Sequence, residues 1–352
     1  MITVKIRPQQ EFELLKDEWK SLENGSDMTA FQSYSWYSMI NEQYKKKAYI
    51  IPGKVFYAAA YDDEKIKMIA PLFIVNLPRF FSKFNIDSGA YILGKWGYTD
   101  YLNFIYDDFS AECFEQLIIC IKERLSVSAF NLHQILPETS MCRYLDEKYS
   151  SSFLFEGDCV KIPVKENFET YNKELSKHSR QNLRTAQNRA AKDGVDIHYE
   201  LYKSISEDDA KEFYSIYSER QKNKRKAEEN CLMFFANELV SKAENKKKKR
   251  YNILTDAMTS LDNAFILGCY SGEEKIGLCF GLEDSNAIRI PVVCFKESYA
   301  KYSPCMVCIY QFIKDSYEKD MIKSFDLLKG TEQYKYRLGG ETVSIKYYKI
   351  TP

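Results

Sequence analysis

The apolar and polar positions along the chain alternate between two periods. Short apolar stretches of strand length occur at 55–61 and 66–75, and again at 264–282 and 287–295. Between such stretches, segments such as 112–125 carry apolar residues at helical spacing. Because a strand repeats every two residues and a helix every 3.6, this pattern predicts an α/β protein with layered sheets and helices.

Two similar hairpins indicate that the chain contains two related halves. AAAYDDEKIKMIAPLF and LGCYSGEEKIGLCFGL each join two apolar strands through a charged turn, and each is followed by another strand, a helix and a strand. The chain has 352 residues, the length of about two domains. We therefore expect two tandem α/β domains, residues 1–160 and 161–352, each a mixed β-sheet flanked by helices.

Composition narrows the class of protein further. Hydrophobic residues make up 45% of the chain and charged residues 28%, which is typical of globular proteins. Fifty basic and fifty acidic residues cancel, so no overall field attracts nucleic acid or anionic lipid. The apolar runs, such as 68–75, are shorter than the ~20 residues of a membrane span. The basic run at 245–250 is more typical of a solvated loop than of a nucleic-acid site.

The cysteines favour a reducing compartment. All ten are scattered along a chain whose first residues have no apolar core of signal-peptide length, so a cytoplasmic protein with reduced thiols is expected. Cys305 and Cys308 form a C-x-x-C pair, but no second pair or histidine cluster accompanies it. We predict small buried side chains there and no metal site.

The segment at Ser303-Pro304 is the first candidate for chemistry. Serine is a preferred N-cap and proline suits the first helical position, so a helix is expected to begin here, directly after a strand and a short loop. The first N–H groups of such a helix lack partners and can bind phosphate. No glycine-rich loop accompanies them, so a plain capped helix remains the commoner alternative.

The second candidate is a basic segment between residues 173 and 192. It holds one acid, Glu174, and six cations: Lys173, Lys177, Arg180, Arg184, Arg189 and Lys192. If the segment is one continuous helix, the first four of these cations share one face, where they repel one another unless an anion binds. A solvated helix face is the alternative.

The third candidate is the segment FDLLKGTEQYKYRLGG, residues 325–340. Gly339-Gly340 is typical of a hairpin turn, so 334–338 and 341–350 are expected to pair as strands. The period of two then puts Lys335 and Arg337 on one face and Tyr334 on the other. A cation on a sheet face could hold a phosphate or a developing oxyanion, or could simply face water at the edge of the sheet.

In this order, the three segments resemble the motifs of GNAT-like N-acyltransferases of the CelD and FemABX type. The residues that carry the resemblance are S-K-H-S-R-Q-N-L-R at 176–184, Y-S-P at 302–304 and F-D-L-L-K-G-T-E-Q-Y-K at 325–335. The N-terminal half agrees as well, through E-W-K-S-L, F-Q-S-Y-S-W, I-A-P-L and T-D-Y-L-N-F-I. No single motif is specific, but the ordered set covers nearly the whole chain.

The resemblance implies two tandem GNAT-like domains, with the active site in the second. It also implies transfer of an acyl group, in particular acetyl from acetyl-CoA, to a small-molecule amine acceptor, such as an amino sugar in polysaccharide or envelope synthesis. One alternative is an aminoacyl-tRNA-dependent transferase of the peptidoglycan type, although the chain has no heptad run for a tRNA-binding coiled coil. The other is a degenerate member that binds a ligand without catalysis.

Carried over by position, the resemblance places the donor pyrophosphate at the helix start. Ser303 and the backbone amides of Cys305 and Met306 would face it. This chain departs from the family pattern at Cys305, where relatives usually have glycine. Glycine lets the backbone approach a phosphate closely, so the cysteine puts coenzyme A binding in doubt.

The resemblance also suggests roles around the reacting carbonyl. Tyr334 and Lys335 would lie there, with Lys335 stabilising the oxyanion, and Asp326 is one candidate for the general base. The arginines expected to hold an anionic donor or acceptor are Arg180, Arg184 and Arg337.

Overall fold

A computed structural model gives the structure of residues 1–45, 52–76, 87–95, 99–203, 205–228, 253–319 and 323–351. The basic run 245–250 and the helix expected at 231–245 lie outside these residues. The chain forms two compact units, residues 1–159 with 343–352, and residues 160–342. The final strand lies mainly in the first unit, whereas the expected boundary after residue 160 assigns it to the second.

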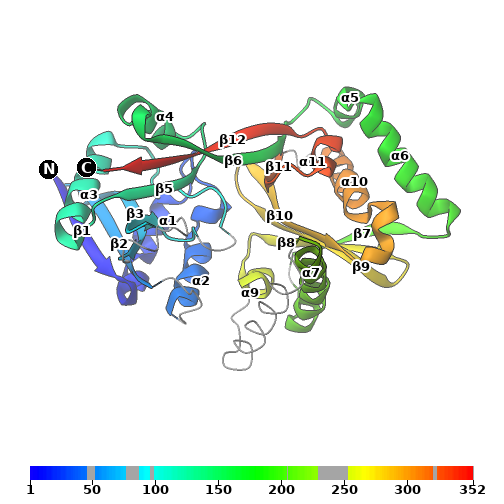
Figure 1. Cartoon of the computed structure of the whole chain (residues 1–352), viewed down its shortest axis with the longest axis horizontal. Coiled ribbons are helices and arrows are strands. Elements are labelled where there is room, and N and C mark those ends of the chain that lie inside the picture. Colours follow the sequence, from blue (N-terminus) through cyan, green and yellow to red (C-terminus); the bar gives the residue numbers. More distant parts are fainter. Residues whose placement is uncertain are drawn as a thin grey trace. The chain divides into compact units, whose positions relative to one another are not determined.

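The first unit is a mixed sheet with helices on both faces (Figure 1). Its strand order is β1-β2-β3-β4-β5-β12, with β4 and β5 parallel and the other determined pairs antiparallel. The strands are β1 (Ile2–Pro8), β2 (Gly53–Asp62), β3 (Lys65–Val75), β4 (Gly89–Ile92), β5 (Phe130–Ile135) and β12 (Glu341–Ile350). The helical elements are η1 (Gln9–Leu15), α1 (Lys16–Leu22), η2 (Ala30–Gln32), α2 (Tyr34–Lys45), α3 (Ala111–Leu125), α4 (Ser140–Lys148) and η4 (Ser150–Ser152).

The second unit repeats this plan. Its strand order is β6-β11-β10-β9-β8-β7, with β10 and β11 parallel and joined by a helix, as β4 and β5 are in the first unit. The strands are β6 (Phe153–Ile162), β7 (Ile197–Tyr202), β8 (Ala264–Ser271), β9 (Glu274–Glu283), β10 (Ala287–Phe295) and β11 (Ser324–Lys329). The helical elements are α5 (Phe168–Glu174), α6 (Lys177–Lys192), α7 (Glu207–Glu228), α9 (Ile253–Ser260), η5 (Glu297–Tyr302), α10 (Pro304–Glu318) and α11 (Gln333–Arg337).

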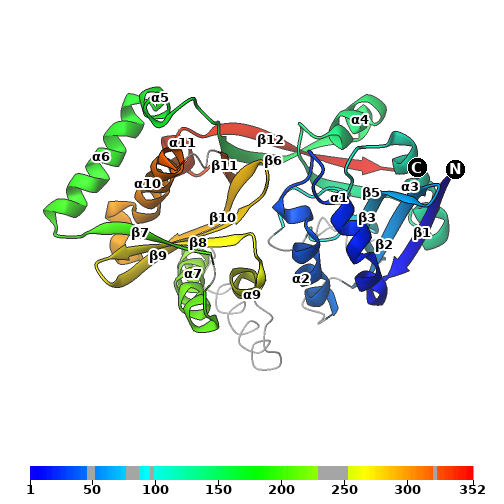
Figure 2. The same ribbon diagram turned by 180° about the vertical axis from the view of Figure 1, so that it is seen from behind.

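The helices of the second unit cover both faces of its sheet. Helix α10 packs on one face with α5, α6 and α11 beyond it, and α7 with α9 packs on the other, as the reverse view in Figure 2 also shows. Strands β8 and β9 are therefore almost entirely buried, which explains why their sequences are nearly continuous apolar runs. The expected fold class, two α/β domains with mixed sheets flanked by helices, is confirmed.

Two strands carry the chain between the units. β6 leaves the first unit and β12 returns to it, and the two are neighbours in the strand order. β12 pairs antiparallel with β5, where Tyr348 lies opposite Leu132.

The expected hairpin around Gly339-Gly340 is wrong, because residues 333–337 form the short helix α11 rather than a strand. The Gly339 amide donates to the Tyr336 carbonyl and the Gly340 amide to the Lys335 carbonyl, which is the hydrogen-bond pattern of a Schellman motif. Gly339 has a φ of 80°. Glycine with positive φ serves a hairpin turn and a helix C-terminus equally well, so the sequence signal was ambiguous.

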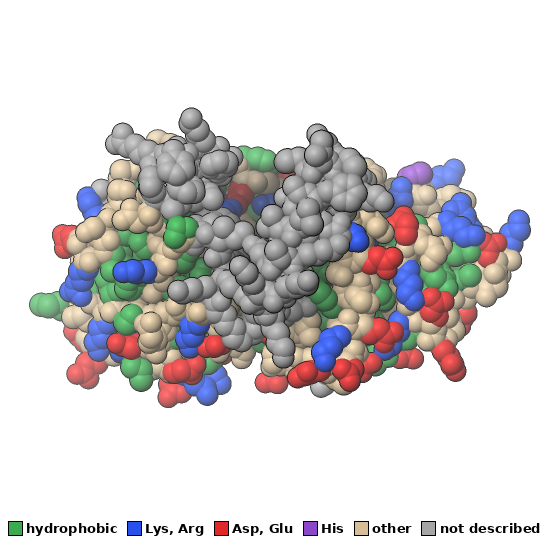
Figure 3. Space-filling view, turned by 60° about the horizontal axis from the view of Figure 1, so that its bottom comes forward, with side chains coloured by type: hydrophobic (Ala, Val, Ile, Leu, Met, Phe, Trp, Pro, Cys, Tyr) green, Lys and Arg blue, Asp and Glu red, His purple; other side chains and the backbone are tan. Residues whose placement is uncertain are grey.

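The surface agrees with the balanced composition. Lys and Arg side chains are interspersed with Asp and Glu over the described surface in Figure 3. Among the described residues, every helix is too short or too polar to cross a bilayer.

Candidate functional site

The central feature of the second unit is a fork between β10 and β11. The two strands pair in parallel only from Ala287 to Arg289, opposite 324–326. Between Arg289 and Val292, β10 shifts its register against β9, and it continues along β9 to Phe295. The parallel ladder with β11 has ended by then. A parallel sheet that opens at the carboxyl ends of its strands is a common place for a ligand.

The first turn of α10 lies at the open end of this fork. Ser303 precedes the helix with φ 48° and ψ 52°, an uncommon left-handed conformation for serine, and its side chain makes no capping hydrogen bond. The Ser303 carbonyl accepts from the Val307 amide at 3.1 Å. The amides of Cys305 and Met306 come earlier and have no acceptor within the helix. The helix start is thus confirmed at the expected residue, with its first-turn amides uncapped by serine.

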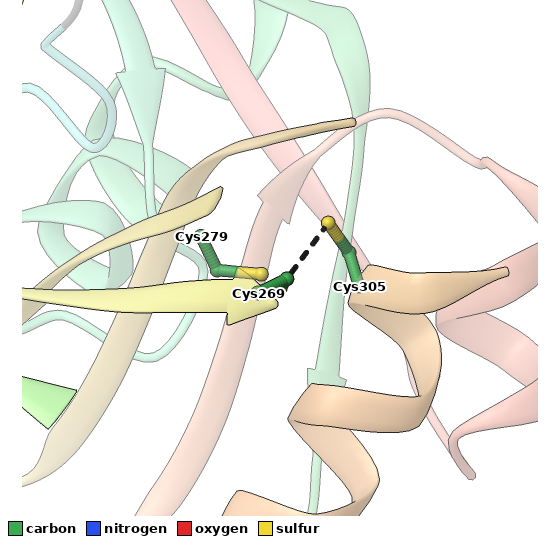
Figure 4. Close-up of side chains that lie close together, drawn as sticks. All are labelled: Cys269, Cys279 and Cys305. Atoms are coloured by element: carbon green, nitrogen blue, oxygen red, sulfur yellow. Dashed lines mark hydrogen bonds between the residues drawn. The ribbon is translucent and has the colours of Figure 1, made fainter. Parts of the chain in front are cut away.

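The Cys305 side chain points into the core, away from water. Its Sγ lies 3.1 Å from the Cys294 carbonyl oxygen on β10 and 3.7 Å from the Cys269 Sγ on β8 (Figure 4). These contacts hold the first turn of α10 against the sheet. The thiol therefore fills interior space, although this does not test coenzyme A binding.

Lys335 does not lie on an exposed sheet face as expected. It belongs to α11, is only 2% exposed, and donates to the carbonyls of Leu328 at 3.1 Å, Lys329 at 2.8 Å and Gly330 at 3.1 Å. Its Nζ also lies 3.1 Å from a Glu332 carboxylate oxygen. An ammonium has three N–H donors, and the three carbonyls use them. Through these hydrogen bonds, the Lys335 side chain stabilises the turn after β11.

Asp326 lies at the last parallel pair, directly opposite Arg289. It is fully buried, its Oδ2 accepts from Arg289 Nη1 at 2.7 Å, and its Oδ1 accepts from the Leu328 amide at 2.9 Å. Arg289 Nε also donates to Asp284 at 2.5 Å. A carboxylate satisfied in this way suits a structural ion pair better than a general base.

Tyr334 is the expected carbonyl-site residue that the structure brings near α10. It packs against the core of the second unit. Burial raises its pKa well above the usual value, and the negative charge of the Glu332 carboxylate raises it further. The phenol therefore stays protonated at neutral pH and can donate a hydrogen bond. Tyr334 packs against the core that contains Cys305, whereas the Lys335 ammonium is bound to the carbonyls of residues 328–330.

The three arginines expected to bind an anion have different surroundings. The basic segment is not one helix, because α5 ends and α6 begins around Leu175-Ser176. Arg180 Nη1 turns back and donates to carbonyls at the end of α5, including Lys173 at 2.7 Å. Arg184 is exposed on α6. Arg337 Nε is buried and donates to no acceptor among the described residues.

A cavity that the sequence did not indicate lies between β7 and α10. Its volume is about 550 Å³, and its lining includes His198, Tyr199, Phe312 and Asp315. The Tyr199 hydroxyl donates to the Asp315 carboxylate, and burial together with that carboxylate raises the pKa of Tyr199. The cavity contains none of the nine expected site residues. The segment VDIHYELY at 195–202 alternates as a strand does, but no sequence motif indicates the cavity beside it.

Comparisons with known proteins agree with this architecture. Residues 177–336 match the family model described as an acetyltransferase (GNAT) domain. A conserved protein of unknown function from Bacteroides thetaiotaomicron VPI-5482 has a similar structure, with a TM-score of 0.57, 13% identity and 100% of both chains covered. FemX is similar with a TM-score of 0.53 and 11% identity, over 98% of this chain and 96% of its own. No curated protein sequence matches the chain significantly.

The matched segment begins at α6, includes the whole fork and ends within α11. Residues 177–336 therefore carry a GNAT domain, as the resemblance seen in the sequence implies, and FemX shares the fold of nearly the whole chain. At these identities, the similar structures establish the fold and leave the substrates open.

The contacts of Lys335 predict a loss of stability on truncation. Lys335→Met removes all three bonds to the carbonyls of residues 328–330, so we expect the free energy of unfolding to fall by about 1–3 kcal/mol. Chemical denaturation measures this. Lys177→Met, at an exposed position of α6, is the matched control and should change stability by less than about 0.5 kcal/mol. Unchanged stability with turnover lowered a hundredfold would restore the catalytic role expected from the sequence.

Arg180 and Arg184, both on α6, are predicted to differ in their effect on stability. Arg180→Ala leaves carbonyls at the end of α5 without a donor and should lower stability by about 1 kcal/mol or more. Arg184→Ala, one turn further along, should leave the melting temperature unchanged. Thermal denaturation of both variants checks the difference. Equal melting temperatures would contradict the capping role of Arg180.

Proposed function

We propose that this protein is an N-acyltransferase that transfers an acyl group from acyl-coenzyme A to an amine. Acetyl is the acyl group that we propose. The observation that carries the proposal is the fork between β10 and β11 that opens beside the uncapped first turn of α10. Together, these features would put an anion-binding helix start, the first turn of α10, next to β10 at the point where β10 no longer pairs with β11. An acyl-CoA needs both kinds of contact, because it joins a pyrophosphate to a long amide-containing arm.

The pyrophosphate would lie at the start of α10. The amides of Cys305 and Met306 point along the helix axis without intrahelical acceptors, and the positive end of the helix dipole favours an anion. The amides of the donor's arm would then pair with β10 beyond Arg289, as an added strand pairs with a sheet edge. The inward position of the Cys305 thiol supports this, because its side chain does not stand outside the helix end.

Tyr334 is our candidate for the residue that contacts the reacting carbonyl group of the donor. In the reaction, the amine nitrogen forms a bond to the carbonyl carbon, the carbon–sulfur bond breaks, and the departing thiolate takes up a proton while the amine loses one. A protonated phenol can donate to the developing oxyanion or to the leaving sulfur, and its raised pKa keeps the proton on it. Lys335 would act indirectly by holding the 328–330 turn that precedes α11.

The acceptor is proposed by class only. The partly exposed Arg337 and the exposed Arg184 would bind an acceptor that carries an anionic group beside its amine. An amino sugar in polysaccharide or envelope synthesis fits this description, and that pathway rests on family analogy alone. We place the reaction in the cytoplasm, since the nine described cysteines are all free thiols.

An aminoacyl-tRNA donor is the second candidate. The similarity to FemX over nearly the full length of both chains favours it, because the family resemblance includes a branch that uses this donor. The two donors differ in size and charge but would both present an ester or thioester carbonyl to an amine.

A thermal-shift and calorimetric titration tests the donor. If coenzyme A binds, it should stabilise the protein by RT ln(1 + [L]/Kd), which is about 2.7 kcal/mol at a hundred times Kd. Ser303→Asp should weaken binding at least tenfold, because a carboxylate at the helix start repels the pyrophosphate. Ser303→Asn is the matched control, since both side chains tolerate the left-handed backbone of this residue. Stabilisation by charged tRNA and none by coenzyme A would instead establish the second candidate.

A further inference from the structure

Three cysteines from three different elements converge in the core of the second unit. Cys269 lies on β8, Cys279 on β9 and Cys305 in the first turn of α10, and their Sγ atoms all lie within 4.8 Å of one another (Figure 4). Residues 267 and 279 are opposite each other in the β8–β9 ladder, so Cys269 and Cys279 point to the same face of the sheet. We call these three residues the thiol cluster.

The spacing of the thiol cluster is that of a coordination shell. A soft cation binds thiolate sulfur at about 2.3 Å, and three such sulfurs around one ion lie about 4 Å apart. The Cys269 and Cys305 sulfurs are already 3.7 Å apart. Closing the shell therefore needs side-chain shifts of about 1 Å or less. Isolated buried cysteines behave as small apolar residues, but three thiols directed at one point go beyond what packing requires.

From this geometry we propose that the thiol cluster binds one soft metal cation, such as Cu(I) or Zn(II). The donor set contains only sulfur, which selects soft ions over Mg²⁺ or Ca²⁺. Each thiol that becomes a thiolate ligand releases one proton to solvent. The positive end of α10 at Cys305 offsets part of the negative charge that remains.

The bound ion would fasten α10 to the sheet. It would link the first turn of the helix to β8 and β9, where the Cys305 sulfur now makes only long hydrogen bonds, with the Cys269 sulfur on β8 and the Leu278 carbonyl on β9. This site does not depend on the proposed acyl transfer, because its ligands and its test involve metal binding alone.

The test is a metal titration of the reduced wild-type protein under anaerobic conditions. Cu(I) and Zn(II) are each added in competition with a chromophoric chelator, and the expected result is one equivalent of at least one ion held by the protein. X-ray absorption of the loaded wild type should give three sulfur neighbours at about 2.3 Å.

Cysteine-to-alanine variants locate the site. Cys269→Ala and Cys279→Ala should each weaken metal binding at least a hundredfold. Cys294→Ala is the matched control, because Cys294 is equally buried but lies opposite Leu278, on the other face of the sheet from the cluster, and it should bind as the wild type does. Circular dichroism checks that the variants fold, and the wild-type absorption spectrum decides the matter if they do not.

Three results would overturn the proposal: no metal retained by the wild type against the chelator, fewer than three sulfur neighbours in the absorption spectrum, or equal loss of binding in Cys294→Ala. Recovery of a Cys269–Cys305 disulfide after exposure to air, with no metal bound by the reduced protein, would mark the cluster as a redox pair instead.

Discussion

The ion pair between Arg289 and Asp326 is the interaction on which the second unit depends. Both side chains are buried, and they lie opposite each other at the last parallel pair of β10 and β11. A buried charge is tolerated only when it is paired and hydrogen-bonded, so this point of the sheet cannot slide or separate without exposing an unpaired charge to the core. Beyond it, the strands are free to diverge. The pair therefore fixes where the fork begins, and with it the site beside α10.

The two units share one topology but differ at the helix that follows the fourth strand. In the first unit, the Ser110 side chain accepts from the Cys113 amide and caps α3. In the second, Ser303 has a left-handed backbone and makes no such bond, so its side chain leaves the amides in the first turn of α10 uncapped. This local difference gives a physical reason for placing the active site in the second unit, as the sequence resemblance implies.

Two cations that the sequence suggested as ligand-binding residues, Lys335 and Arg180, instead donate hydrogen bonds to backbone carbonyls. Lys335 binds the carbonyls of a turn in which Leu328 and Gly330 both have positive φ, and Arg180 binds the carbonyls at the end of α5. Carbonyls at such chain reversals lack partners within helices and strands, and a long cationic side chain can supply several donors at once. A cation that follows a turn in the sequence is therefore as consistent with capping as with substrate binding.

The sequence by itself determined the elements that depend on local pattern. The hairpins β2–β3 and β8–β9, strand β10 and the start of α10 at Ser303-Pro304 all follow from apolar periodicity and capping residues. It could not determine what only long-range packing decides. Gly339-Gly340 suits a hairpin and a helix end equally, and α11 forms because Tyr334 and Lys335 find partners in the core and in the turn after β11. The thiol cluster joins residues 36 positions apart, Cys269 and Cys305, so no spacing rule reveals it. The assembled sheet decides which side chain contacts which carbonyl, charged group or sulfur. Only that assembly determines which groups are buried away from water.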